Sequence, residues 1–204
     1  MRHHTIKTIL LGDCDTGKTT LFQAFINGGV GQAATQPTIA FDCFGKELVL
    51  EGYGAVAFQL WDTSGAERFS SIAMTQAYYR HTDGVLLVFD VTRATSFAAI
   101  SEVWLARLRS ARQMPAHYRC VLVGNKCDLG GRVVSVAEAL ALAAQHGWDY
   151  CELSALHASP QEVRQPFAML AVQLLDQPRE LAESTEAWVL VDAPPAQPTQ
   201  QKCC

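Results

Sequence analysis

One short segment near the N-terminus limits the possible folds of this chain more than any other. It is Gly12-Asp13-Cys14-Asp15-Thr16-Gly17-Lys18-Thr19, with the spacing G-x-x-x-x-G-K-T. An apolar segment with strand composition, residues 6–11, precedes it, and a segment typical of a helix, residues 20–26, follows it. In a glycine-bounded loop between a strand and a helix, the backbone can turn so that its N–H groups point inward. These donors and the N-terminus of the helix both attract phosphate oxygens. The sequence therefore predicts a phosphate-binding loop.

Two side chains of this loop have chemistry of their own. We expect the ammonium group of Lys18 to reach the outer phosphates of a nucleotide and to stabilise their charge, which makes Lys18 the candidate catalytic residue. We expect the hydroxyl group of Thr19 to coordinate Mg2+. The nucleotide-binding residues predicted in this part of the chain are Asp13, Cys14, Asp15, Thr16, Gly17, Lys18, Thr19 and Thr20.

Composition narrows the class of protein. The chain has 204 residues, of which 49% are hydrophobic, so it can bury the core of one domain. Its formal net charge of -4 is spread without long runs, and the lack of a basic stripe argues against nucleic acid as a partner. The seven cysteines show no metal-ligand spacing, so we expect a reduced, intracellular compartment. The sequence shows neither a signal peptide nor an apolar run long enough to span a membrane.

Apolar, β-branched segments alternate with segments of helical composition along most of the chain. This alternation predicts a doubly wound α/β domain, in which ligands bind at the carboxyl ends of the strands. A glycine-rich loop, residues 51–55, joins the second and third strands as a hairpin, so we expect one antiparallel edge strand on an otherwise parallel sheet. The expected strands are 6–11, 41–50, 56–61, 85–91, 120–125 and 150–153, and the expected helices are 17–27, 70–79, 96–112, 136–146 and 159–176.

The composition changes near the end of the last expected helix. Residues 1–178 are predicted to form the domain, and residues 179–204 are polar and contain several prolines, which is typical of a mobile tail. Within the tail, Trp188-Val189-Leu190-Val191 is an apolar island. It either folds back onto the domain or docks on a partner, and the sequence leaves both interpretations open.

Two further segments are expected to contact the phosphates and the metal ion. Trp61-Asp62-Thr63-Ser64-Gly65 ends the third strand, where the Asp62 carboxylate can hold Mg2+ through water and the Gly65 N–H can contact the terminal phosphate. Thr38 lies in the loop before the second strand, where its hydroxyl can complete the Mg2+ shell when a third phosphate is present. The predicted metal-binding residues are therefore Thr19, Thr38 and Asp62.

The ends of the last two strands indicate which base is bound. Asn125-Lys126-Cys127-Asp128 ends the fifth strand, and a carboxylate at Asp128 can accept two N–H bonds from guanine. Adenine lacks that paired donor edge, so Asp128 favours GTP over ATP and argues against an ATP-dependent kinase. Ser154-Ala155 ends the sixth strand, where a backbone N–H can meet the guanine oxygen. The predicted base-binding residues are Asn125, Lys126, Asp128, Ser154, Ala155 and Leu156.

These motifs resemble those of the Ras superfamily of small GTPases and, within it, of the Rab family. Residues 61–69, W-D-T-S-G-A-E-R-F, are close to the Rab pattern W-D-T-A-G-Q-E-R-F, and Tyr78-Tyr79-Arg80 and Phe89-Asp90-Val91-Thr92 add to the similarity. The resemblance covers roughly residues 6–176 and the last two residues. It implies the P-loop GTPase fold, an α/β architecture with a doubly wound six-stranded, mostly parallel sheet, one antiparallel edge strand and five flanking helices.

The resemblance also implies a function. Rab proteins are switches in vesicle and membrane trafficking that bind and hydrolyse GTP, so the implied cofactors are GTP or GDP and Mg2+. Cys203 and Cys204 match the Rab site for two geranylgeranyl groups, which would hold the chain at the cytoplasmic face of an intracellular membrane while it cycles with the cytosol. Two unmodified thiols are the alternative. The implied partners are an exchange factor, a GTPase-activating protein, effectors and a prenyl-chaperone protein, and we expect a monomer.

The chain departs from the Rab pattern at several positions. Ala66 replaces the glutamine that orients the attacking water, so we expect slow intrinsic GTP hydrolysis. Asp15 places a carboxylate beside the phosphates, Leu156 replaces a lysine whose stem covers the base, and no Phe or Tyr occurs between residues 26 and 40 to face the guanine. We therefore expect faster nucleotide release than in a typical member. A GTP-loaded scaffold that binds effectors without cycling is the alternative function.

Overall fold

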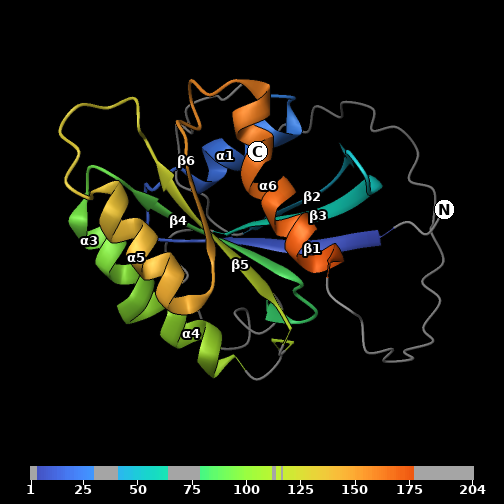
Figure 1. The fold of residues 1–204 in the computed structure, drawn as a ribbon, viewed down its shortest axis with the longest axis horizontal. Coiled ribbons are helices and arrows are strands. Elements are labelled where there is room, and N and C mark those ends of the chain that lie inside the picture. Colours follow the sequence, from blue (N-terminus) through green and yellow to red (C-terminus); the bar gives the residue numbers. More distant parts are fainter. Residues whose placement is uncertain (1–3, 30–40, 64–78, 112–113, 116, 177–204) are drawn as a thin grey trace, which may run out of the picture.

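The computed structural model describes residues 4–29, 41–63, 79–111, 114–115 and 117–176, and its centre is a six-stranded sheet (Figure 1). All six expected strands are present. β3 begins at Gly54 rather than at residue 56, and β6 begins at Asp149 because this residue pairs with Val121 of the neighbouring strand. The strands are β1 (His4–Leu11), β2 (Phe41–Leu50), β3 (Gly54–Thr63), β4 (Gly84–Asp90), β5 (Arg119–Asn125) and β6 (Asp149–Glu152).

The strand order is β2-β3-β1-β4-β5-β6. β1 pairs in parallel with both β3 and β4, β5 is parallel to β4 and to β6, and only β2 is antiparallel, to β3. The expectation of one antiparallel edge strand is therefore confirmed. From β1 the chain goes to β2 and β3 on one side of it, and from β3 it crosses to β4 on the other side. The carboxyl end of β1 is therefore at the position where an open α/β sheet binds its ligand.

Helices cover both faces of the sheet (Figure 1). α1 (Lys18–Ile26) and α6 (Pro160–Leu175) lie on one face, and α3 (Ala94–Ala99), η2 (Ile100–Trp104), α4 (Leu105–Ser110) and α5 (Val136–His146) lie on the other. The helix expected at 96–112 is thus a continuous run from residue 94 to 110 that contains a π-helical stretch, η2. The helix expected at 70–79 lies, except for its last residue, outside the described residues.

Each face of the sheet has its own apolar core. On the α1 and α6 side, Phe25 stacks on Phe167 with ring centroids 3.8 Å apart, and Phe58 of β3 meets both rings edge-on. On the other side, the fully buried Trp104 is part of the core. Every residue of β4 is buried, as expected for a central strand covered on both faces. This packing fixes the strand ends from which the candidate site is built.

Two helices begin at sequence features that are recognisable in advance. Ser135 and Glu138 form a capping box at the start of α5, and Ser159 and Glu162 form a second one at the start of α6. Within the described residues, none of the helices combines the length and the apolarity that crossing a membrane requires.

Candidate functional site

The loop between β1 and α1 requires glycine at both of its ends. Gly12 has φ 149° and Gly17 has φ 89°, which are conformations that other residues rarely adopt. A Cβ atom on Gly12 would lie 2.0 Å from the carbonyl oxygen of Val88 in β4, and a Cβ on Gly17 would lie 2.2 Å from Nδ2 of Asn125. The two glycines of the motif are therefore set by backbone conformation and by close packing against β4 and Asn125.

Lys18 is the centre of this loop. Only 4% of the residue is exposed, and its Nζ donates to the carbonyl oxygens of Gly12, at 2.7 Å, and Asp13, at 3.0 Å. The Thr16 hydroxyl donates to the same Asp13 carbonyl at 2.9 Å. The loop thus curls around a buried ammonium group, which is the arrangement that an anionic phosphate would require.

Asn125 joins three segments of the site. Its Nδ2 donates to the carbonyl oxygen of Thr16 at 2.8 Å, and its Oδ1 accepts the backbone N–H of Ala155 at 2.9 Å. Asn125 is 2% exposed and Ala155 is 3% exposed, so both hydrogen bonds are buried. The end of β5, the loop after β6 and the β1–α1 loop are therefore held together by one carboxamide.

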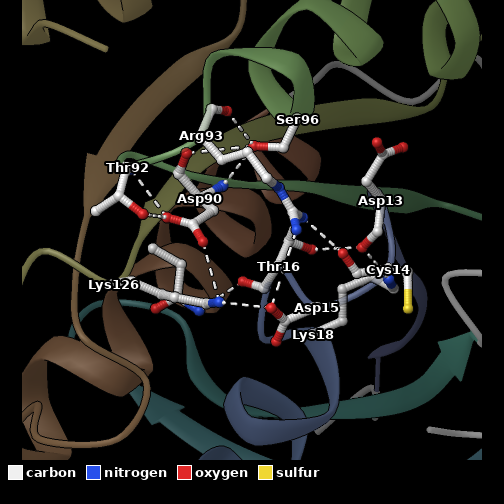
Figure 2. Close-up of polar contacts among 11 residues, drawn as sticks. Asp13, Cys14, Asp15, Thr16, Lys18, Asp90, Thr92, Arg93, Ser96 and Lys126 are labelled. Atoms are coloured by element: carbon white, nitrogen blue, oxygen red, sulfur yellow. Dashed lines mark hydrogen bonds and ion pairs between the residues drawn. The ribbon is translucent and has the colours of Figure 1, made fainter. Parts of the chain in front are cut away.

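Asp15 has two cationic neighbours. Its Oδ2 lies 3.3 Å from Nζ of Lys126 and 3.9 Å from a guanidinium nitrogen of Arg93 (Figure 2). The backbone of Asp15 is left-handed, with φ 61°, a conformation that aspartate tolerates better than most residues, and its side chain is 78% exposed. The carboxylate that the sequence places beside the phosphates is therefore paired with two positive charges.

Lys126 is itself held by a second, buried carboxylate. Its Nζ lies 3.0 Å from Oδ2 of Asp90, whose Oδ1 accepts the backbone N–H of Thr92 at 2.9 Å and the Thr92 hydroxyl at 2.7 Å (Figure 2). Burial alone would raise the pKa of the Asp90 carboxyl, but the hydrogen bonds from Thr92 and the charge of Lys126 outweigh it, and the pKa is lowered. Asp90 is thus an anion at neutral pH that positions Lys126.

Two of the three candidate metal ligands lie in the described part of the chain, one on a strand and one on a helix. Asp62 is fully buried near the end of β3 and pairs in register with Leu10 of β1, while Thr19 is in the first turn of α1, just after the loop. Hydroxyl and carboxylate oxygens are the ligands that Mg2+ prefers. Among the described residues, no cluster of three or more His, Cys, Asp or Glu side chains forms a separate metal site. By this chemistry Thr19 and Asp62 fit a Mg2+ ion, which would supply positive charge next to bound phosphates.

The residues predicted to bind the base lie in the segments that follow β5 and β6. Asp128 follows β5, and its carboxylate is 3.7 Å from Nε2 of His157. Leu156 is 40% exposed, beside Ser154, whose hydroxyl accepts the backbone N–H of His157 at 3.1 Å. The structure thus brings the two motifs predicted to bind the base together at the carboxyl ends of β5 and β6.

The loop after β5 is braced by an ion pair. Arg132 donates to both carboxylate oxygens of Glu152, at 2.8 and 2.6 Å, and Tyr150 also donates to Glu152. Burial, followed by the charge of Glu152, raises the pKa of Cys127 to about 11, so this thiol is a neutral group in the brace. The brace keeps the loop carrying Lys126 close to β6.

Sequence reasoning missed several neighbours of the phosphate loop. Arg93 donates to the carbonyl oxygen of Cys14 at 2.6 Å, and the indole N–H of Trp104 donates to Asp13 at 3.1 Å. Neither residue belongs to a spacing motif, so only the three-dimensional arrangement reveals them. The only indication in the sequence is the segment Asp90-Val91-Thr92, which directly precedes Arg93. From the sequence, this segment contributes only to the similarity to the Rab family.

Several positions singled out in the sequence are not placed. The positions that lie outside the described residues are Thr38, Gly65, Ala66, Tyr78, the apolar island at residues 188–191, Cys203 and Cys204. Their assigned roles stay predictions.

Comparisons with known proteins agree with this arrangement. The sequence profile of the Ras family matches residues 7–176. The chain is 41% identical over 154 residues to Ras-related protein Rab-42 of Mus musculus, which covers 74% of this chain and 70% of that protein. It is 38% identical over 171 residues to Ras-related protein Rab-39A of Homo sapiens, with 82% and 76% covered. It is 36% identical over 207 residues to Ras-related protein RABC2a of Arabidopsis thaliana, with 98% and 94% covered.

Proposed function

The chain belongs to the Ras family of small GTPases, as a divergent Rab-type member that acts in membrane trafficking, and from this premise we propose that it is a slowly hydrolysing switch. In this proposal the GTP-bound form recruits effectors and the GDP-bound form does not.

The observation that carries the proposal is the double hydrogen bond of Asn125. It ties the loop expected to hold phosphates to the segment expected to hold the base, through Thr16 and Ala155. A single ligand with a phosphate end and a base end would span these two segments. A guanine nucleotide has this shape, and Asp128 supplies the carboxylate that distinguishes guanine from adenine.

The remaining residues have separate tasks in this proposal. Lys18 stabilises charge on the outer phosphates, and the loop residues 13–20 surround the phosphates with N–H donors. Thr19, Thr38 and Asp62 would hold Mg2+, which supplies further charge neutralisation when it is bound. Asn125, Lys126, Asp128, Ser154, Ala155 and Leu156 form the base end.

A titration of the purified chain by calorimetry, with GDP, GTP and ATP in the presence of Mg2+, tests this assignment. We expect heat of binding with both guanine nucleotides and none with ATP. Asp128→Ala should weaken guanine binding without unfolding the chain, since Asp128 is at the surface end of the site. Equal affinities for ATP and GTP would contradict the assignment of the base end.

We further propose that hydrolysis is slow because of Ala66. Alanine has no amide that can orient the attacking water, so an activating protein has to supply the missing group. In a single-turnover assay, Ala66→Gln should hydrolyse bound GTP faster than the natural chain. Equal rates would contradict the proposal. The second candidate function, a persistently GTP-loaded effector scaffold, is favoured by the same residue, and it predicts that no activating protein accelerates hydrolysis.

We also propose that residues 179–204 form a tail that anchors the domain of residues 1–178 to a membrane. Two lipid groups on Cys203 and Cys204 would give stable anchoring, whereas one would give only marginal binding. The proposed partners are an exchange factor, an activating protein, effectors and a prenyl-chaperone protein, with a monomeric chain on the cytoplasmic face of an intracellular membrane. A Cys203→Ser, Cys204→Ser double variant should move to the soluble fraction of cells. Its persistence in the membrane fraction would count against lipid anchoring.

A further inference from the structure

Arg93 forms a contact between the β4–α3 connection and the β1–α1 loop. One guanidinium nitrogen donates to the carbonyl oxygen of Cys14 at 2.6 Å, and another lies 3.9 Å from the Asp15 carboxylate (Figure 2). Both contacted residues belong to the loop that carries the phosphate-binding motif. Arg93 therefore contacts this loop from a part of the chain that no nucleotide-binding motif contains.

The backbone of Arg93 is held firmly in place. Its N–H donates to the carbonyl oxygen of Asp90 at 3.0 Å, and its carbonyl oxygen accepts the hydroxyl of Ser96 at 2.8 Å. Ser96 is fully buried, and its Oγ also accepts the backbone N–H of Asp90 at 3.0 Å. These hydrogen bonds fix the backbone of Arg93 relative to the end of the central strand β4. The position from which the guanidinium group extends is therefore fixed as well.

The contact between Arg93 and Asp15 offsets an unfavourable negative charge in the β1–α1 loop. A carboxylate next to nucleotide phosphates would repel them and shorten the time that the nucleotide stays bound. Asp15 instead lies between Lys126, at 3.3 Å, and Arg93, while Lys126 also satisfies Asp90, at 3.0 Å. Lys126 is thus shared between the carboxylates of Asp15 and Asp90. Arg93 supplies a second positive charge, so two cations balance these two carboxylates.

We propose that Arg93 is a positioning residue of the phosphate-binding loop, which fixes the Cys14 carbonyl and, together with Lys126, neutralises Asp15 so that bound nucleotide is released more slowly. The inference rests on the proposed function, because it requires that the loop holds nucleotide phosphates. It goes beyond that function by assigning the control of nucleotide release to a side chain outside the nucleotide-binding motifs.

The test measures release of a fluorescent GDP analogue from the full-length chain, in Mg2+ and with excess unlabelled GDP as competitor. We expect Arg93→Ala to release the analogue about fivefold faster than the natural chain, the factor that one partly exposed charge-assisted contact provides. Arg93→Lys should fall between the two, because lysine keeps the charge but lacks the planar fork that reaches Cys14 and Asp15 together.

A double-mutant cycle separates this role from a general structural one. In an Asp15→Ala background the Arg93→Ala substitution should accelerate release clearly less, because the charge that Arg93 neutralises has gone. Arg109→Ala, which removes the same charge from the exposed end of α4, should leave the release rate unchanged. Midpoints of thermal unfolding should be similar for all variants.

Each outcome has one meaning. If the natural chain binds no GDP analogue, the proposed function fails and this inference fails with it. If the natural chain binds the analogue but Arg93→Ala releases it at the natural rate, only the inference is overturned. It is also overturned if Arg93→Ala has the same effect with and without Asp15, because Arg93 would then act independently of that carboxylate.

Discussion

The side-chain amide of Asn125 donates to the carbonyl oxygen of Thr16 across the base of the site, in a buried hydrogen bond of 2.8 Å. The same carboxamide accepts the N–H of Ala155, so both of its polar ends are used. A buried carbonyl and a buried N–H on other segments thus depend on one side chain.

Replacing Asn125 by alanine should destabilise the fold and weaken nucleotide binding together. The substitution leaves the Thr16 carbonyl and the Ala155 N–H buried without their partner, at a cost of about 1–3 kcal/mol for each group. Urea unfolding monitored by circular dichroism measures the loss. Gln145→Ala, which removes an amide from the exposed side of α5, is the matched control and should change the free energy of unfolding by no more than about 0.5 kcal/mol. An Asn125→Ala chain as stable as this control would show that the two hydrogen bonds do not matter.

A second prediction concerns Gly17. A methyl group there would lie 2.2 Å from Nδ2 of Asn125, and the backbone has φ 89°, so Gly17→Ala should both strain the loop and displace Asn125. We expect a loss of roughly 2 kcal/mol or more in the free energy of unfolding and no measurable GDP binding. Gly130→Ala is the control, because a Cβ there would meet no atom within 4 Å. Tight GDP binding by Gly17→Ala would rule out the loop geometry described above.

Part of the candidate site and all six strands could be predicted from the sequence, for physical reasons. Lys18, Asn125 and Asp62 can be found from the sequence because each belongs to a motif whose spacing follows from one strand end and its adjoining loop. Their convergence follows from the parallel sheet, since carboxyl ends of parallel strands meet at one edge. The six strands were predictable for a related reason, because buried central strands such as β4 require continuous apolar runs.

Contacts between distant segments were not predictable in this way. The sequence places Asp15 in the loop and indicates that its charge is unfavourable, but its pairing with Arg93 depends on how the β4–α3 connection turns back over the loop. The π-helical stretch η2 ends at the fully buried Trp104 and has an ordinary helical composition, so local sequence preference does not distinguish it from the α-helices on either side.

The Asp90 carboxylate should make the free energy of unfolding depend on pH in the acidic range. Its pKa is lowered from the ordinary value of 3.8, so the stabilisation it provides is complete above that value and is lost as the pH falls through the lowered value. At neutral pH, Asp90→Asn should therefore be less stable than the natural chain by about 1.5–3 kcal/mol, and the difference should shrink below pH 4 or so. Urea unfolding between pH 2.5 and about 7 measures this. The exposed Glu102→Gln serves as control, and a difference for Asp90→Asn that is constant down to the lowest pH would contradict the role assigned to its charge.

The last prediction uses the cysteines of the chain as reporters of nucleotide binding. Cys14 is exposed in the β1–α1 loop and Cys43 is exposed on the edge strand β2. Cys120 and Cys151 are buried, and burial raises the pKa of Cys151 to about 12. Brief alkylation of nucleotide-free protein at pH 8 or so should therefore label Cys14 and Cys43 but neither buried thiol, as measured by peptide mass spectrometry. Saturating GDP and Mg2+ should cover the loop and reduce labelling of Cys14 by about fivefold or more, while Cys43 acts as the internal control and keeps its rate. Equal labelling of Cys14 with and without bound GDP would show that the nucleotide does not occupy this loop.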